Sequence, residues 1–206
     1  MNLHQETRLK DALRTLRELS LELEINLLHN YGYRELLQIS EARGYFENLE
    51  KARGLHKEDA SSKFYSNIEF KSCKSKRLKC NRFSKTTKFE FDKQNDEFRR
   101  KQTLSYDAMV FTVFDSSSET PVLTAIIKNK ESMDEINKAI KLKQKAFLKL
   151  LKESTQKGKR VLRDSISFNI EEIFNLTSVI WVQDKKEITK EEAKKLFKMN
   201  KNNKKT

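Results

Sequence analysis

The N-terminal part of the chain carries a regular stripe of leucines, spaced three and four residues apart: Leu9, Leu13, Leu16, Leu19, Leu23 and Leu27. Such spacing places the leucines on one face of an amphipathic helix. We therefore expect a long helix over 3–28, ended by the sequence Asn30-Tyr31-Gly32. Two shorter helices are expected near 33–42 and 45–52. The leucine stripe suits either packing into a core or a dimer surface.

The middle of the chain changes to patterns that are typical of strands. Residues 59–71 suggest a hairpin, within which Ile68-Glu69-Phe70-Lys71 alternates between apolar and charged side chains. Residues 89–92 alternate in the same way. Residues 106–115 form a nearly continuous apolar run, rich in aromatic and β-branched side chains. Such a run predicts a central strand that is buried on both faces.

The order of the remaining elements sets the expected fold class. Further strands are expected over 121–127, 166–168 and 178–182, and further helices over 132–152 and 191–198. Helices, mixed strands, a helix and then strands predict an α/β or mixed α+β protein. Its central sheet would be mixed and flanked by helices. We expect an N-terminal helical region (1–52), a core (53–184) and a basic C-terminal helix and tail (185–206).

Composition narrows the function classes. The 206 residues suit one domain, and 43 Lys and Arg against 30 Asp and Glu give a net charge of +13. This surplus favours a polyanionic partner such as DNA or RNA. Glycine-rich phosphate-binding motifs are absent from the sequence, which argues against the nucleotide-binding classes that use them. No apolar run approaches the roughly 18 residues of a membrane span, so no membrane association is expected.

Two cysteines, Cys73 and Cys80, are too few for a disulfide framework. They could bind zinc with two of the three histidines, but the spacing fits no standard site. We expect free thiols in a reducing cytosol, and hence a cytoplasmic protein. That the protein is bacterial and nucleoid-associated is an expectation that rests on the family resemblance given below.

The positive charge is clustered rather than scattered. Eight basic residues and no acidic one lie between positions 71 and 88: Lys71, Lys74, Lys76, Arg77, Lys79, Arg82, Lys85 and Lys88. An AT-rich genome would enrich lysine too, but it would scatter lysines among acids. We therefore expect DNA contacts from Lys74, Lys76, Arg77, Arg82, Ser84, Lys85 and Thr86, and from Lys159 and Arg160 in a later loop.

Asp59, Glu69 and Lys71 form the constellation with the clearest chemistry. Residues two apart on a strand share a face, so Glu69 and Lys71 project together. A tight hairpin would return Asp59 to their side. Two carboxylates suit Mg²⁺, which can activate a water, and a lysine can hold that water or stabilise a phosphate in the transition state. The alternative is a surface ion pair on an edge strand.

This stretch resembles the PD-(D/E)xK nuclease superfamily, and in particular the PvuII-like type II restriction endonucleases. Those enzymes carry Asp-Ala, eight further residues and then Glu-x-Lys-Ser, which Asp59-Ala60 and Glu69-Phe70-Lys71-Ser72 match. The resemblance covers residues 55–150 in the layout of strands and helices, and about a dozen positions in identity. It implies that Asp59 and Glu69 bind the metal, that Lys71 is catalytic, and that the N-terminal helices form a homodimer. A histidine run that one member of the family carries after the catalytic strand is missing here, so the recognised base sequence does not carry over.

The resulting prediction is a Mg²⁺-dependent, site-specific endonuclease that hydrolyses double-stranded DNA as a homodimer, with a restriction-endonuclease-like fold. One alternative keeps the fold and makes the protein a resolvase, nickase or repair nuclease. Another is a non-catalytic basic protein that binds DNA or RNA.

Overall fold

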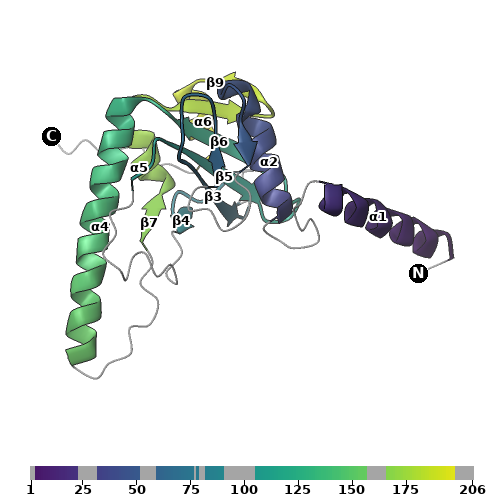
Figure 1. Ribbon diagram of the computed structural model, residues 1–206, viewed down its shortest axis with the longest axis horizontal. Coiled ribbons are helices and arrows are strands. Elements are labelled where there is room, and N and C mark those ends of the chain that lie inside the picture. Colours follow the sequence, from purple (N-terminus) through teal and green to yellow (C-terminus); the bar gives the residue numbers. More distant parts are fainter. Residues whose placement is uncertain are drawn as a thin grey trace.

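The fold is built around a mixed seven-stranded sheet with helices on both sides (Figure 1). The computed structural model describes residues 3–22, 32–51, 59–76, 78, 82–90, 105–156 and 166–197. Along the sheet the strands are, in spatial order, β1 (Glu50–Lys51), β2 (Ala60–Ser61), β3 (Ile68–Ser75), β5 (Ala108–Asp115), β6 (Pro121–Ile127), β8 (Ile180–Gln183) and β9 (Lys186–Ile188). Neighbours are antiparallel except β3 and β5, which run parallel.

The other described elements cover this sheet or extend from it. Strands β4 (Lys88–Glu90) and β7 (Ser167–Asn169) pair in a second, two-stranded sheet. The helices are α1 (Leu3–Glu22), α2 (Gly32–Ala42), the 3₁₀ turn η1 (Arg43–Tyr45), α4 (Lys130–Gln156), α5 (Ile170–Asn175) and α6 (Lys190–Lys195). None of the helices in these described ranges combines the length and the apolar character needed to cross a bilayer.

Strand β5 explains why the sequence has a continuous apolar run. All eight of its residues are buried, and successive side chains enter two different clusters. Ala108 and Val110 belong to the α2-side cluster, which also contains Ile39 of α2. Met109 and Phe111 belong to the α4-side cluster, which also contains Ile136 of α4. Side chains alternate across a strand, so a strand covered on both faces is apolar at most of its positions; Thr112 and Asp115 are its two buried polar residues.

Most predicted elements are confirmed. The mixed sheet flanked by helices is present, and β5, β6 and α2 lie where the pattern placed them. The helix expected over 45–52 is wrong: the chain makes η1 and then β1, which pairs with β2. The boundary expected at 184/185 falls inside the β8–β9 hairpin, and Phe197 is buried in the α4-side cluster.

The leucines of the stripe whose burial the structure describes do not pack into the core, and Leu23 and Leu27 lie outside the described residues. In the described part of α1, Leu13, Leu16 and Leu19 are exposed by 44%, 38% and 39%. Figure 1 shows α1 apart from the sheet. Of the two roles that suit the stripe, core packing is therefore not seen for these three leucines.

We expect Phe111→Ala to lower the free energy of unfolding by about 3–5 kcal/mol, because it opens a cavity in a packed core. The Phe111 ring is 1% exposed and meets Phe89 edge-on, with ring centroids 5.0 Å apart. The matched control is Phe64→Ala, since Phe64 is 70% exposed and contacts the Lys63 amine. Urea unfolding of this control should differ from wild type by no more than about 1 kcal/mol. Equal losses in the two variants would contradict the two-layer core.

Candidate active site

The β2–β3 hairpin brings Asp59 back to the middle of β3. Pairing of the two strands ends at Ala60 opposite Ile68. Two residues further along β3, the amide of Phe70 donates a hydrogen bond of 2.7 Å to Oδ2 of Asp59. Phe70 lies between Glu69 and Lys71 in sequence. The expected return of the aspartate is therefore seen, and the backbone of β3 fixes its position.

Asp107, immediately before β5, anchors the tip of this hairpin. Its Oδ2 accepts hydrogen bonds from the Ser66 amide (3.0 Å), the Ser66 hydroxyl (2.8 Å) and the Asn67 amide (3.0 Å). In return, the Asp107 amide donates to the Asn67 carbonyl at 2.9 Å. These contacts give Asp107 a structural role at the hairpin.

Glu69 and Lys71 project from the same face of β3. In the parallel register they lie beside Met109 and Phe111, both of which belong to the α4-side cluster. The two side chains form an ion pair and are only 8% and 18% exposed. Strand β3 lies between β2 and β5. The pair is therefore a largely desolvated one on an interior strand, rather than a solvated pair on an edge.

Gln38 of α2 is a contact that sequence reasoning missed. Its side chain is 3% exposed, and its Nε2 donates a hydrogen bond of 3.2 Å to the carbonyl oxygen of Lys71. The helix thus fixes the backbone of the residue that carries the candidate catalytic amine. The sequence held one signal for this contact. Gln38 lies one helical turn before Ala42 and so shares a helix face with it, and Ala42 is fully buried.

Cys73 continues the same face of β3 and packs against the α4-side cluster. Burial raises the pKa of the Cys73 thiol well above its usual range, and the positive charge of Arg34 opposes that rise. The thiol therefore stays protonated at neutral pH, and a role as nucleophile or metal ligand is disfavoured.

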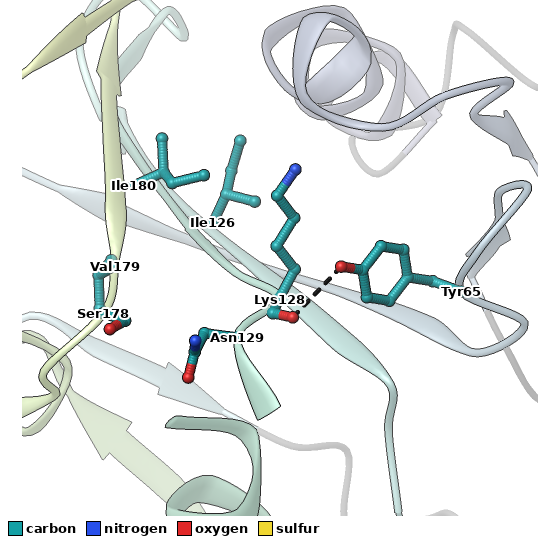
Figure 2. A pocket seen from close by; sticks show the side chains of 7 residues that line it. All are labelled: Tyr65, Ile126, Lys128, Asn129, Ser178, Val179 and Ile180. Carbon is teal, nitrogen blue, oxygen red and sulfur yellow. Dashed lines mark hydrogen bonds between the residues drawn. The ribbon is translucent and has the colours of Figure 1, made fainter. Parts of the chain in front are cut away.

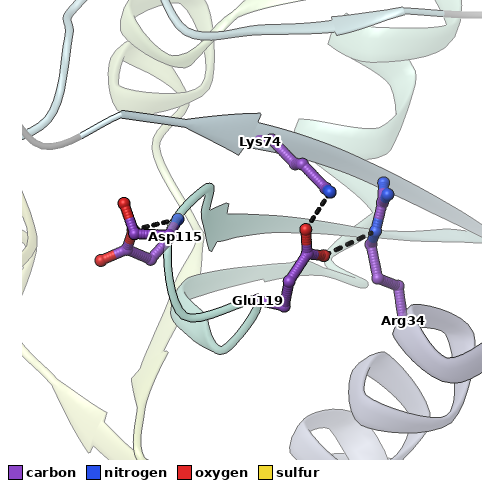
Figure 3. A network of polar contacts seen from close by, with 5 residues as sticks. Arg34, Lys74, Asp115 and Glu119 are labelled. Carbon is purple, nitrogen blue, oxygen red and sulfur yellow. Dashed lines mark hydrogen bonds and ion pairs between the residues drawn. The ribbon is translucent and has the colours of Figure 1, made fainter. Parts of the chain in front are cut away.

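At the far end of β3, Lys74 is already engaged by protein. Its amine forms an ion pair with Glu119 in the β5–β6 turn, and Arg34 of α2 approaches the same carboxylate at 3.7 Å (Figure 3). Asp115, also drawn there, accepts a hydrogen bond of 2.9 Å from the Ser117 amide. Lys74, which was expected to contact DNA, thus has an evident structural role.

The other expected DNA-contacting residues divide by position. Lys76, Arg82 and Thr86 are exposed, and Lys85 is partly exposed. The Ser84 and Thr86 hydroxyls hydrogen-bond to each other at 2.7 Å within a local turn. Three of the expected residues, Arg77, Lys159 and Arg160, lie outside the described residues, as do His56 and Cys80.

A separate cavity of about 400 Å³ opens near the end of β6 (Figure 2). It is lined by Tyr65, Ile126, Lys128, Asn129, Ser178, Val179 and Ile180. The Tyr65 hydroxyl donates to the Lys128 carbonyl at 3.3 Å, and the Lys128 amine donates to the Tyr45 carbonyl at 2.6 Å. The site carboxylates Asp59 and Glu69 are not among its lining, so the cavity and the candidate site are distinct.

The candidate site offers few side chains that could bind a metal ion. Within the ranges that the structure describes, no group of three or more His, Cys, Asp or Glu side chains gathers in metal-binding geometry. Asp59 and Glu69 supply two carboxylates, which matches a magnesium site that relies on one or two carboxylates, waters and substrate phosphate.

No protein-family model matches the chain, and no curated protein is significantly similar to it in sequence.

The burial of the Glu69–Lys71 pair can be tested by a double-mutant cycle in EDTA. Lys71→Met removes the partner of a mostly buried carboxylate and should cost about 3 kcal/mol of unfolding free energy. Combining it with Glu69→Gln should recover part of that loss, with a coupling energy of about 1–3 kcal/mol.

The Lys63–Glu47 pair is the control, because its N–O distance is 2.6 Å but its side chains are 51% and 50% exposed. Its coupling should stay below about 1 kcal/mol. Urea unfolding curves provide the measurement. Similar coupling energies for the two pairs would contradict the buried arrangement.

Proposed function

We propose that the protein is a Mg²⁺-dependent endonuclease that hydrolyses phosphodiester bonds in double-stranded DNA, with a PD-(D/E)xK-type site. The observation that carries this proposal is the hydrogen bond from the Phe70 amide to Asp59. It places one carboxylate against the strand that presents Glu69 and Lys71 on a single face. These are the residues that the sequence resemblance assigns to metal binding and catalysis.

The donor chemistry of the site fits the metal. Asp59 and Glu69 would hold Mg²⁺ through carboxylate oxygens, the ligands that this hard cation prefers. When bound, the metal would supply a more acidic water and neutralise charge on the phosphate. The hydrogen bond to Phe70 restrains the Asp59 carboxylate, and burial restrains Glu69. Both restraints reduce the reorganisation needed before reaction.

Lys71 provides the fixed positive charge. The Gln38 contact holds its backbone, and the ion pair with Glu69 holds its amine at the site. In a poorly solvated site a positioned cation stabilises the negative charge that develops on a phosphate more strongly than it would in water. We assign Lys71 this role and the positioning of the attacking water.

Within this class we favour a type II restriction enzyme that acts as a homodimer. Two active sites related by a twofold axis match the two antiparallel strands of a short palindrome. The exposed leucines of α1 offer a surface for that dimer. A resolvase, nickase or repair nuclease would share the site but would cleave by DNA structure or on one strand.

Incubation with long phage DNA tests the proposal directly. Wild-type protein with Mg²⁺ should give discrete fragments, and EDTA should abolish them. Asp59→Asn, Glu69→Gln and Lys71→Met should each lower the cleavage rate by about 100-fold or more.

Lys186→Met is the matched control, because Asp184-x-Lys186 repeats the acid-x-lysine pattern with both side chains exposed, from the β8–β9 turn to the start of β9. This variant should cleave at the wild-type rate. Smeared or structure-dependent products would favour the other nucleases. DNA that stays intact while binding persists would contradict catalysis and leave a binding protein.

The dimer is tested by Leu16→Lys, with Thr15→Lys as control. Both positions are exposed on α1, but only Leu16 belongs to the leucine stripe. A buried lysine at a dimer contact should raise the dimer dissociation constant at least about 10-fold, whereas Thr15→Lys should leave it unchanged. Sedimentation velocity over a concentration series measures both. A wild-type protein that sediments as a monomer at high concentration would contradict the dimer.

A further inference from the structure

Only part of the long helix α4 packs against the core. Met133, Ile136 and Ile140 are 3%, 2% and 0% exposed and belong to the α4-side cluster. Figure 1 shows the helix continuing well past the sheet toward its C-terminal end. The remaining faces of α4 therefore need not serve folding.

The charge on α4 changes sign along its length. Its first turns carry Glu131, Asp134 and Glu135, whereas residues 137–152 contain six lysines and no acidic residue. Five of these lysines are exposed and lie three or four residues apart: Lys138, Lys141, Lys145, Lys149 and Lys152. At 3.6 residues per turn they fall within an arc of about 80°, and they span about 21 Å along the axis. We call these five residues the lysine stripe.

The sixth lysine of this segment, Lys143, serves the fold and contrasts with the stripe. The amine of Lys143 donates to the Ser167 carbonyl at 2.6 Å, pairs with Glu172 at 2.7 Å, and lies 4.2 Å from the centroid of the Phe168 ring. In the stripe, Lys149 approaches Glu153 at 3.9 Å, with the two side chains 80% and 46% exposed. A pair of that kind leaves most of the charge available to a partner.

We propose that the lysine stripe is a sequence-independent contact surface for the phosphate backbone of double-stranded DNA. About 21 Å corresponds to about six base pairs at 3.4 Å per step. Lysine acts as a point charge toward phosphate and reads no base edge by itself, so the stripe should strengthen binding to every sequence. The inference rests on the proposed function in taking DNA as the partner, but it concerns binding rather than cleavage.

An anionic membrane surface is the competing polyanion. An amphipathic helix binds a bilayer by inserting its apolar face. Here the apolar residues Met133, Ile136 and Ile140 are already buried in the protein. Leu142 and Leu150 are exposed by 60% and 46%, with the small exposed side chain of Ala146 between them. Two large apolar side chains make a narrower face than the broad apolar face by which such helices insert. The arrangement therefore favours DNA.

The test is equilibrium binding of a labelled 30-base-pair duplex of arbitrary sequence, in EDTA so that cleavage is prevented, over a range of salt concentrations. The variant changes all five lysines of the stripe to Gln. The control variant removes the same charge from exposed lysines elsewhere: Lys10, Lys63, Lys185, Lys186 and Lys195. Circular dichroism checks that both variants keep their helices.

Loss of the stripe should weaken binding at least about 10-fold near 100 mM salt. The slope of log K against log[salt], which is negative, should also become less steep by about 2–4, since each lost phosphate contact removes about 0.9 from its magnitude. The control should keep a slope closer to that of wild type. A stripe variant with the wild-type slope, or one no weaker than the control, would overturn the inference.

Two further outcomes would also overturn it. One is a wild-type protein that does not bind the duplex. The other is stripe-dependent binding to phosphatidylserine vesicles without stripe-dependent DNA binding. Because no cleavage is measured, a binding protein without nuclease activity would still pass this test. If the protein cleaves DNA but the stripe variant binds the duplex as tightly as wild type, this inference fails and the proposed function stands.

Discussion

The rest of the structure depends on burying both faces of β5. All eight residues of this strand are enclosed, and its alternate side chains point into two separate apolar clusters. One layer alone could cover only one face, so the chain must supply helix α2 on one side and β4–β7 with α4 on the other. A parallel neighbour such as β3 also requires a crossover that leaves the sheet and returns. Strand β4, within that crossover, helps to form the second layer.

This constraint also places the charged pair. The parallel register with β5 sets Glu69 beside Met109, on the face that the α4-side cluster covers. An ion pair in such surroundings adds little net stability, because removing two charges from water costs about as much as their attraction returns. An apolar pair would suit the sheet at least as well. Groups held at such a cost gather at functional sites, which supports a chemical role for Glu69 and Lys71.

Sequence reasoning succeeded where local pattern and burial agree. The continuous apolar run gave β5, and the alternation around Glu69 gave β3, with Asp59 at hairpin distance. Strand β9 was missed because the hairpin before it turns at Asp184 and Lys185. Both have positive φ values (51° and 63°), a conformation that sequence patterns associate with Asn-Gly rather than Asp-Lys.

Other features depend on contacts between distant segments. Residues 45–52 have helical character, yet pairing with β2 draws 50–51 into the sheet, because tertiary context overrides local propensity. The Gln38 contact joins residues 33 positions apart, so the chain near Gln38 could not identify Lys71 as its partner. The leucine stripe shows the reverse case, since a helical period reports one apolar face but does not say which molecule covers it.

The positive charge of the chain has more than one origin. Some lysines serve the fold: Lys128 donates to the Tyr45 carbonyl and lies over the Phe46 ring, and Lys74 pairs with Glu119. A lysine-rich genome would supply such residues without regard to helical phase. It would not set five exposed lysines of α4 at intervals of three and four while leaving acids out of the same 16 positions. Phase and the absence of acids, rather than the net charge of +13, are therefore what support the proposed contact with a polyanion.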